Sequence, residues 1–433
     1  MQLSARVQVS IEMMDIFFSS HAPFDLIMAK FFRNNRWIGS KDRREIAEFS
    51  YSIFRNFEKL RFFAANITSN FGRFYVLIFL KIEYKLSEGK IIEIFSGKPH
   101  APPELIDFEK RFINSLDEKS EFPEHVLFNY PEWMAPLLKR SFASGDCASE
   151  IQAFNARAPV DLRVNTLKSS KDEVRKMLED SGFQMADCEY SSNGLRLLKG
   201  RIGRNHDVIV NGLAEIQDEG SQLVAEVCAA LPGNTVVDFC AGAGGKTLAI
   251  AAAMKNKGRI FALDKYEKRL ENAAIRFRRA NVNNVFCQQI SGKWIKRHLE
   301  CADIVLVDVP CSGIGTWRRN PDMRAKFTSE DLHELLILQE EILESAHRLV
   351  RKDGRLVYAT CSILKEENED QIAKFLNNHP EFEIQKIQLQ NYCGNYLKLT
   401  PYKHKTDGFF AVSLIKNSNV DYAQSEFSCE SKA

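Results

Sequence analysis

The stretch VVDFCAGAGGKT, residues Val236–Thr247, places a glycine-rich turn directly after a short apolar run and before a helical pattern. Because glycine has no side chain, a turn of this kind lets a ligand approach the backbone closely. Helical stretches such as TLAIAAAM and EKRLENAAIRFRRAN separate it from further apolar runs, which are GRIFALD, VFCQQI, ADIVLVDVP and RLVYATCS. Strands that alternate with helices predict an α/β fold with a doubly wound, mostly parallel sheet.

Two kinds of ligand compete for this loop. The sequence GGKT is similar to a phosphate-binding loop, and the later IVLVD could supply a magnesium carboxylate. That loop pattern, however, requires glycine where this chain has Cys240. A nucleoside-binding loop requires a carboxylate at the end of the second strand to take two ribose hydroxyls, and Asp264 closes GRIFALD. The spacing therefore favours a nucleoside cofactor over a nucleoside triphosphate. A tight turn without a ligand is the remaining alternative.

Two cysteines follow the ends of the next strands. Cys311 comes after ADIVLVDVP, behind Asp308 and a proline, and Cys361 ends the next strand in YATCS. Doubly wound sheets bind ligands beyond the carboxyl ends of their strands, so we expect both thiols near one crevice. A single cysteine of this kind is most simply a packed apolar residue. Two of them at adjacent strand ends favour a functional pair.

The chain divides by pattern into four parts. Residues 1–120 carry apolar and aromatic residues at helical spacing and predict a helical domain. Residues 125–230 predict a small α+β module, with a strand in PVDLRVNTL, a helix in KDEVRKMLEDSG and a hairpin that turns at Asn193–Gly194. Residues 231–417 hold the alternating strands and helices, and GFFAVSLIK supplies a late strand. Residues 418–433 are polar and predict a disordered tail.

The bulk composition limits the class of protein. A chain of 433 residues exceeds one ordinary core, and its 45% hydrophobic and 27% charged residues are typical of globular proteins. The apolar runs are too short for a membrane helix, and the first residues lack a signal-peptide core, which favours the cytoplasm. Ten cysteines without a C-x-x-C pair argue against zinc and against a disulfide framework, so we expect no metal. A net charge of +2 requires any nucleic-acid surface to be local.

Several motifs carry a specific resemblance. They are VDFCAGAGGKT, VDVPCSGIGTWRRNPD, LVYATCSILKEENEDQI and TDGFF, with LRVNTLK and IQDEGSQLVA before them. Together they resemble the motifs of the RsmB/Nop/Sun family of RNA cytosine-5 methyltransferases, and the paired PCSG and ATCS are highly specific. GSKDRREIAEFSY, at residues 39–51, is similar to the NusB-like domain of the RsmB branch. The resemblance covers nearly the whole chain, most closely residues 160–415.

The resemblance implies a Rossmann-like class I methyltransferase domain, preceded by an α+β RNA-binding module and an all-α NusB-like domain. It implies S-adenosylmethionine as the cofactor and carbon 5 of a cytosine in RNA as the methylated atom. Small-subunit (16S) rRNA is the expected target because of the NusB-like start, and tRNA is the close alternative. A P-loop ATPase and a non-catalytic RNA-binding assembly factor are the alternatives from other classes. We expect a monomer with no membrane partner.

The resemblance also assigns the cofactor-binding residues. The glycine loop would cradle the methionine part, Asp264 would hold the ribose, and the position of Ser291 would face the adenine. The family usually has aspartate at that last position and proline at the position of Ala243. The expected cofactor-binding residues are Cys240, Ala241, Gly242, Ala243, Gly244, Gly245, Lys246, Asp264, Ser291 and Asp308.

The catalytic roles follow from the same resemblance. Cys361 would add to carbon 6 of cytosine as a thiolate, which makes carbon 5 able to attack a sulfonium methyl group. A free thiol titrates near pH 8.5, so a nearby cation such as Lys246 would help it to ionise. Asp308 would hydrogen-bond the ring nitrogen and the exocyclic amine, and Cys311 would assist the elimination that releases the product.

The RNA surface is expected beside these residues and on the α+β module. The aromatic ring and the arginines of TWRRNPD suit base stacking and phosphate contact. For the basic residues of the module, including Arg201 and Arg204, an ordinary solvated surface is the alternative. The expected RNA-binding residues are Arg163, Lys168, Trp317, Arg318 and Arg319.

Overall fold

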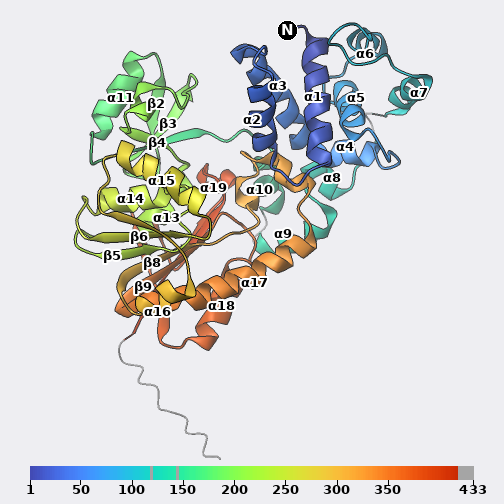
Figure 1. The fold of residues 1–433 in the computed structure, drawn as a ribbon. Coiled ribbons are helices and arrows are strands. Elements are labelled where there is room, and N and C mark those ends of the chain that lie inside the picture. Colours follow the sequence, from blue (N-terminus) through green and yellow to red (C-terminus); the bar gives the residue numbers. More distant parts are fainter. Residues whose placement is uncertain (118–119, 143–145, 418–433) are drawn as a thin grey trace, which may run out of the picture. The chain divides into compact units, whose positions relative to one another are not determined.

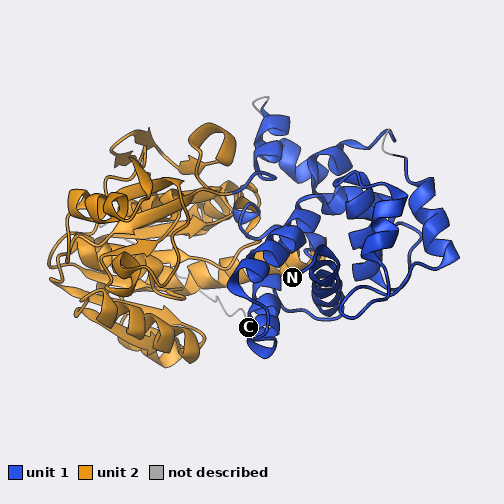
Figure 2. Cartoon of the chain, turned by 90° about the horizontal axis from the view of Figure 1, so that it is seen from above, with its two compact units in different colours: residues 1–157, 316–329 blue, residues 158–315, 330–433 orange. Residues whose placement is uncertain are grey.

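The computed structural model describes residues 1–117, 120–142 and 146–417, and the predicted disordered tail lies outside them. The chain forms two compact units (Figure 2). Unit 1 consists of residues 1–157 and 316–329, and unit 2 consists of the remainder. Within the described residues, no helix combines the length and the apolar character needed to cross a membrane.

Unit 1 is built from helices whose apolar sides share one core, as the spacing of its aromatic residues predicts. The buried ring of Phe17 meets Phe24 and Phe54 edge-on, at centroid distances of 5.9 and 4.8 Å. This is a preferred geometry for buried aromatic pairs. The elements are α1 (Leu3–Phe18), α2 (Phe24–Asn34), α3 (Ser40–Arg55), α4 (Phe57–Phe63), α5 (Phe71–Ile82), α6 (Glu88–Ile94), α7 (Asp107–Ser115), α8 (Glu124–Phe128), η1 (Glu132–Met134), α9 (Ala135–Ser141) and α10 (Cys147–Ala153).

One segment of unit 1 comes from far along the chain. Residues 316–329, which follow the PCSG motif, include the short helix η3 (Pro321–Ala325). Asp322 accepts a hydrogen bond from the backbone N–H of Phe24 at 3.0 Å. Arg324 is fully buried, and it donates to the carbonyl of Asn129 at 2.8 Å. The contacts therefore assign this segment, and also α8–α10, to the helical unit, whereas the sequence pattern grouped them with the later domains.

Unit 2 begins with the small sheet expected for the α+β module. Its strand order is β2-β3-β1-β4, all antiparallel, and the hairpin between β2 and β3 is confirmed. The predicted helix begins at a capping box, in which Ser170 and Glu173 bond each other's backbone N–H. The elements are β1 (Val160–Val164), α11 (Lys171–Asp180), β2 (Gln184–Asp187), β3 (Gly194–Lys199), α12 (Asp207–Val210) and β4 (Ala214–Ile216).

The large sheet of unit 2 confirms the predicted doubly wound architecture. Its main strand order is β10-β14-β9-β8-β5-β6-β7, with β13 beside β14. The strands from β5 to β9 run parallel, and the late strand β14 runs antiparallel to β9. The strands are β5 (Thr235–Asp238), β6 (Arg259–Asp264), β7 (Val285–Gln289), β8 (Ala302–Asp308), β9 (Val350–Thr360), β10 (Phe382–Gln385), β13 (Leu397–Leu399) and β14 (Phe409–Lys416), and a separate pair is β11 (Ile387–Leu389) and β12 (Tyr392–Gly394).

Helices cover both faces of this sheet (Figure 1). In β8, Ile304 and Leu306 face one apolar cluster, and Val305 and Val307 face the other. Strands buried on both faces require continuous apolar sequences, which explains the run IVLV. One face carries α13 (Glu219–Val227), α14 (Gly245–Ala253) and α15 (Glu267–Arg279), and the other carries α16 (Gly292–Arg297), α17 (Ser329–Ala346) and α18 (Glu369–Asn378).

Candidate active site

The two predicted thiols meet at the ends of neighbouring strands. β8 and β9 pair in parallel, with Asp308 opposite Ala359 in the register. The chain then turns at both ends and brings the Sγ atoms of Cys311 and Cys361 to 3.3 Å from each other. Their expected adjacency is thus confirmed, because parallel strands present their carboxyl ends at one edge of the sheet.

The two thiols differ in their surroundings. The hydrogen bond with Cys361, followed by burial, raises the pKa of the Cys311 thiol well above its ordinary value. Cys311 therefore holds its proton at neutral pH, and it can donate that proton toward the sulfur of Cys361. Either sulfur can donate in this contact, so the geometry alone does not distinguish the two thiols, and the choice of Cys361 as the nucleophile stays a prediction.

An ion pair lies beside the thiols. The Nζ of Lys246, in the first turn of α14, donates to Oδ2 of Asp308 at 2.7 Å. Burial opposes the charge on Lys246, but the carboxylate of Asp308 and then Cys361 outweigh it, so that the pKa of this ammonium is raised. Lys246 is the nearby cation that the sequence suggested for Cys361. Its hydrogen bond goes to Asp308, and its charge interacts with Cys361 through space.

A buried carboxylate holds the turn that carries Cys311. Glu367 is 0% exposed, and its Oε1 accepts from the backbone N–H of Ser312 at 2.8 Å. Its Oε2 accepts from the hydroxyl of Ser312, and Gln339 donates to Oε1 at 3.0 Å and to the carbonyl of Pro310 at 3.1 Å. Nothing in the sequence marks Glu367, because in KEENED it looks like part of an exposed charge run. Only the fold shows that it faces inward.

Two glycines fix the turn after Cys361. The backbone N–H of Gly315 donates to the carbonyl of Cys361 at 3.0 Å, and Gly315 in turn accepts from the N–H of Gly408 at 2.7 Å. A Cβ on Gly315 would lie 2.0 Å from the carbonyl oxygen of Gly408. No other residue fits this crossing without moving the backbone. The glycine of the TDGFF motif therefore packs against the turn that holds the nucleophile candidate.

The glycine loop joins β5 to α14, as predicted. Gly244 has a φ of +77°, and a Cβ there would lie 2.6 Å from the ring of Phe277. This glycine is thus required by helix packing. Gly242 also has a positive φ, of +55°, and a Cβ there would meet nothing closer than 4.0 Å. The first N–H groups of α14 lack carbonyl partners within the helix, and no side chain caps it, so the loop can hold an anionic group such as a carboxylate.

Asp264 ends β6 beside this loop. It is 5% exposed, and its Oδ2 accepts from the backbone N–H of Gly242 at 3.0 Å, while Oδ1 accepts from the N–H of Tyr266 at 2.8 Å. Each carboxylate oxygen can take a second hydrogen bond, so a ligand hydroxyl remains possible at this edge. The loop and this acidic residue therefore form one hydrogen-bonded unit that fits a nucleoside cofactor.

A further carboxyl lies beneath the loop. Asp238, at the end of β5, is 1% exposed, and the hydroxyl of Thr247 donates to its Oδ2 at 2.6 Å. Burial raises the pKa of Asp238 to about 7. Its Oδ1 has no hydrogen-bond partner among the described residues. Asp238 is not among the predicted site residues, although an acidic residue that ends a buried strand is itself a signal.

Ser291 lies where β7 ends and α16 begins. Its hydroxyl is exposed and accepts from the backbone N–H of Trp294 at 3.2 Å, which makes Ser291 the cap of α16. The backbone N–H of the preceding residue, Ile290, donates to the carbonyl of Asp264 at 3.1 Å. Ser291 therefore follows the strand next to Asp264. Its role toward an adenine ring stays a prediction.

The structure corrects part of the predicted RNA surface. Arg163 is buried, and its Nε donates to Oε1 of Gln217 at 2.6 Å, so this guanidinium does not face solvent. Burial lowers the pKa of Arg163 to about 10. Lys168 is exposed, but its Nζ donates to the backbone carbonyls of Asn211 at 2.6 Å and Arg279 at 3.2 Å.

The predicted stacking platform also differs. Trp317 is 1% exposed, and the guanidinium of Arg324 lies 4.6 Å from the centre of its ring. Arg318 is buried and Arg319 is half-buried. A buried indole with a guanidinium over its ring cannot stack on a base from this position, so Trp317 is a packing residue of unit 1. Arg319 stays a predicted RNA contact.

Comparisons with known proteins agree with this architecture. An open parallel sheet, a glycine loop after its first parallel strand and an acidic residue at the end of the next define a Rossmann-like domain. The family described as 16S rRNA methyltransferase RsmB/F matches residues 225–415 of that domain. The ferredoxin-like domain of RsmF/B-like methyltransferases matches residues 130–202. The class of protein is therefore a Rossmann-like methyltransferase.

Individual relatives extend the likeness over most of the chain. The probable ribosomal RNA small subunit methyltransferase B of Synechocystis is 32% identical over 71% of this chain and 71% of its own length. The ribosomal RNA small subunit methyltransferase B of Photorhabdus laumondii is 30% identical over 72% of each chain. The crystal structure of PH0851 covers 96% of this chain and 99% of its own, with 26% identity and a TM-score of 0.78. The chain belongs to the RsmB/F methyltransferase family.

Proposed function

We propose that this protein transfers a methyl group from S-adenosylmethionine to carbon 5 of a cytosine in small-subunit ribosomal RNA. The observation that supports it best is the pair of thiols, Cys311 and Cys361, 3.3 Å apart at two strand ends. A simpler methyl transfer to a nitrogen or oxygen needs no thiol nucleophile, whereas carbon 5 of cytosine needs a nucleophile to activate it. The names of the RsmB relatives support the ribosomal target.

The residues around the glycine loop fit the methyl donor. The start of α14 suits its carboxylate, and the carboxylate of Asp264 suits the ribose hydroxyls. The Oδ1 of Asp238, which has no partner among the described residues, ends the strand before the same loop and is an acceptor that would suit a positively charged amine. When bound, the donor supplies an electrophilic methyl group on a sulfonium. The protein's own groups then orient the base and move the protons.

Cys361 is the proposed nucleophile. Its thiolate would add to carbon 6 of the cytosine, and carbon 5 would then carry the electron density that the methyl transfer requires. The Cys311 thiol, which keeps its proton, would stabilise the Cys361 thiolate by hydrogen bonding. The ion pair of Lys246 and Asp308 would meet the ring nitrogen and the exocyclic amine and stabilise the charge that develops there.

Release requires the proton on carbon 5 to leave before the bond from carbon 6 to sulfur can break. Cys311 is the proposed proton acceptor for this elimination, directly or through one water. To act as this base, Cys311 must first release its own thiol proton to bulk water. The thiolate that forms is then a strong base, because its pKa is raised. The electron pair of the broken C–H bond restores the double bond between carbons 5 and 6, and Cys361 departs as a thiolate.

The ribose assignment can be tested on its own. We expect Asp264→Ala to weaken S-adenosylmethionine binding about 10- to 100-fold, because the ribose loses a charged acceptor and the loop loses its bond at Gly242. Isothermal titration calorimetry measures this effect. Asp264→Asn is the matched control. Its side-chain carbonyl keeps one acceptor, so the loss of S-adenosylmethionine affinity should be smaller than in the alanine variant. An unchanged dissociation constant in the alanine variant would refute the assignment.

The target is tested with purified protein and separate RNAs. We expect methylation of carbon 5, read by bisulfite sequencing, on small-subunit rRNA and none on tRNA. Methylation of tRNA alone would keep the chemistry and change the substrate. Tight ATP binding with no S-adenosylmethionine binding would overturn the proposal in favour of an ATPase. RNA binding without binding of ATP or S-adenosylmethionine would favour an assembly factor.

A further inference from the structure

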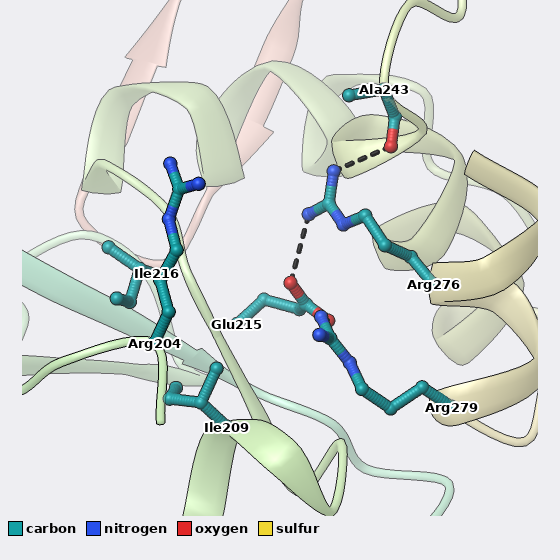
Figure 3. Close-up of a pocket in the computed structure, with 7 residues that line it drawn as sticks. All are labelled: Arg204, Ile209, Glu215, Ile216, Ala243, Arg276 and Arg279. Carbon is teal, nitrogen blue, oxygen red and sulfur yellow. Dashed lines mark hydrogen bonds and ion pairs between the residues drawn. The ribbon is translucent and has the colours of Figure 1, made fainter. Parts of the chain in front are cut away.

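A cavity in unit 2 carries more positive charge than its own carboxylate can balance. It has a volume of about 390 Å³ and lies where α12, β4, α15 and the glycine loop come together (Figure 3). Its arginines outnumber its only acidic residue by three to one. The lining residues are Arg204, Ile209, Glu215, Ile216, Ala243, Arg276 and Arg279.

The arginines of α15 already share that acidic residue. Arg276 lies 2.9 Å and Arg279 lies 2.5 Å from the carboxylate oxygens of Glu215. Arg276 also donates to the carbonyl of Ala243 at 2.5 Å, which joins the cavity to the glycine loop. One carboxylate neutralises one guanidinium, so one positive charge on this wall remains. Both side chains keep partial exposure, 25% for Arg276 and 30% for Arg279.

Arg204 adds a second unbalanced charge. Its side chain is exposed, and none of the described carboxylates pairs with it. Figure 3 shows Arg204 on one side of the cavity and the two arginines of α15 on the other. A guanidinium without a partner at the mouth of a basic cavity is suited to bind an anion, since arginine presents a planar fork of donors that matches phosphate.

The remaining walls indicate what accompanies the anion. Ile209 and Ile216 line the cavity beside Arg204, and Ile216 is 38% exposed. An apolar wall beside a basic one suits a nucleotide, with its sugar or base against the isoleucines and its phosphate on the arginines. The volume is also in the range of pockets that hold organic ligands, about 300–1,000 Å³.

We propose that this cavity binds one nucleotide of the RNA substrate outside the target cytosine, with the phosphate held by Arg204, Arg276 and Arg279. The inference rests on the proposed RNA methylation and adds a substrate contact to it. The link from Arg276 to Ala243 places this contact next to the loop assigned to the methyl donor. In this proposal, Arg276 contacts both the bound RNA and the loop assigned to the methyl donor.

The test compares single arginine variants of the full chain. We expect Arg204→Ala to raise the KM for RNA about tenfold with kcat unchanged, and to reduce the salt dependence of RNA binding by about one phosphate contact. Among the residues that the structure describes, none pairs with the exposed side chain of Arg204, so its loss should not affect folding. Arg201→Ala is the matched control, because Arg201 lies on the same loop and does not line the cavity. A second pair of variants lies on α15. Arg279→Ala removes an arginine that lines the cavity, and Arg278→Ala is its control because Arg278 does not line it.

Each other outcome has a definite meaning. Equal effects in Arg204→Ala and Arg201→Ala would overturn the site, because general charge would then explain the loss. Weaker S-adenosylmethionine binding in Arg204→Ala, measured by calorimetry, would assign the cavity to the donor instead. Competition by free cytidine monophosphate, with RNA binding unchanged in the variants, would indicate a mononucleotide site. If the wild type methylates no RNA, the proposed function fails, while the RNA-binding comparison still decides the cavity.

Discussion

Cys311→Ala should accumulate a covalent protein–RNA adduct that survives boiling in detergent and disappears with ribonuclease. The order of the steps gives the reason. Attack by Cys361 on carbon 6 comes first, methyl transfer follows, and loss of the carbon 5 proton comes last. Without the Cys311 sulfur 3.3 Å from Cys361, the last step has no base, and we expect turnover to fall on the order of 10²–10⁴-fold. A denaturing gel and a methylation assay measure both effects.

Cys361→Ala supplies the contrasting result. It should form no adduct and no methylated product, because the step before methyl transfer is blocked. The double variant should also lack the adduct, since the missing nucleophile acts upstream. Two cysteines that only pack together would give no such difference. An adduct in Cys361→Ala would exchange the two roles, and the absence of an adduct in both single variants would remove the covalent mechanism.

The sequence predicted those parts of the molecule that depend on local pattern. Apolar runs between helical stretches correctly placed the five parallel strands. The inner strands need apolar residues because both of their faces are covered, whereas β7 lies at the edge of the sheet and is mostly exposed. The adjacency of Cys311 and Cys361 follows from strand order, since both lie beyond carboxyl ends of neighbouring strands. These inferences need no knowledge of side-chain direction.

The sequence could not predict contacts that depend on which way a polar side chain points. Trp317 and the arginines after it look like an exposed basic loop, but Trp317 and Arg324 are buried in the helical unit. Arg163 alternates with apolar residues in its strand, and the fold turns it inward to Gln217. Gly315 and Gly408 are 93 positions apart along the chain, so only the folded backbone shows that they touch. In each case the deciding partner is distant in sequence.

Glu367 holds the turn that carries Cys311, although it lies 55 residues away from Ser312 along the chain. This contact has a measurable consequence. Glu367→Ala removes the acceptor of the Ser312 N–H, its hydroxyl and the Gln339 amide, all in a buried site. A buried donor without an acceptor costs about 1–3 kcal/mol, so we expect unfolding to become easier by roughly 2–4 kcal/mol. Thermal unfolding of the full chain measures this loss of stability.

The same substitution should also affect chemistry at temperatures where the protein stays folded. The turn Pro310–Ser312 carries Cys311, and two of its backbone groups are held by Gln339 and Glu367. Once the carboxylate is gone, Cys311 is free to move away from Cys361, so release should slow and the adduct should accumulate as it does in Cys311→Ala. A role in stability alone would lower the midpoint of unfolding and leave the amount of adduct unchanged.

Glu367→Gln is the control that separates these effects, because the amide can satisfy the same groups. Its carbonyl oxygen can accept from the Ser312 N–H and from Gln339, as Oε1 does now. Its amide can donate to the Ser312 hydroxyl, which can then donate to the hydroxyl of Ser362, 3.2 Å away. We therefore expect near-normal stability and little adduct in the glutamine variant. If it traps the adduct as strongly as Glu367→Ala, the negative charge itself takes part in release, and the positioning role assigned to Glu367 is wrong.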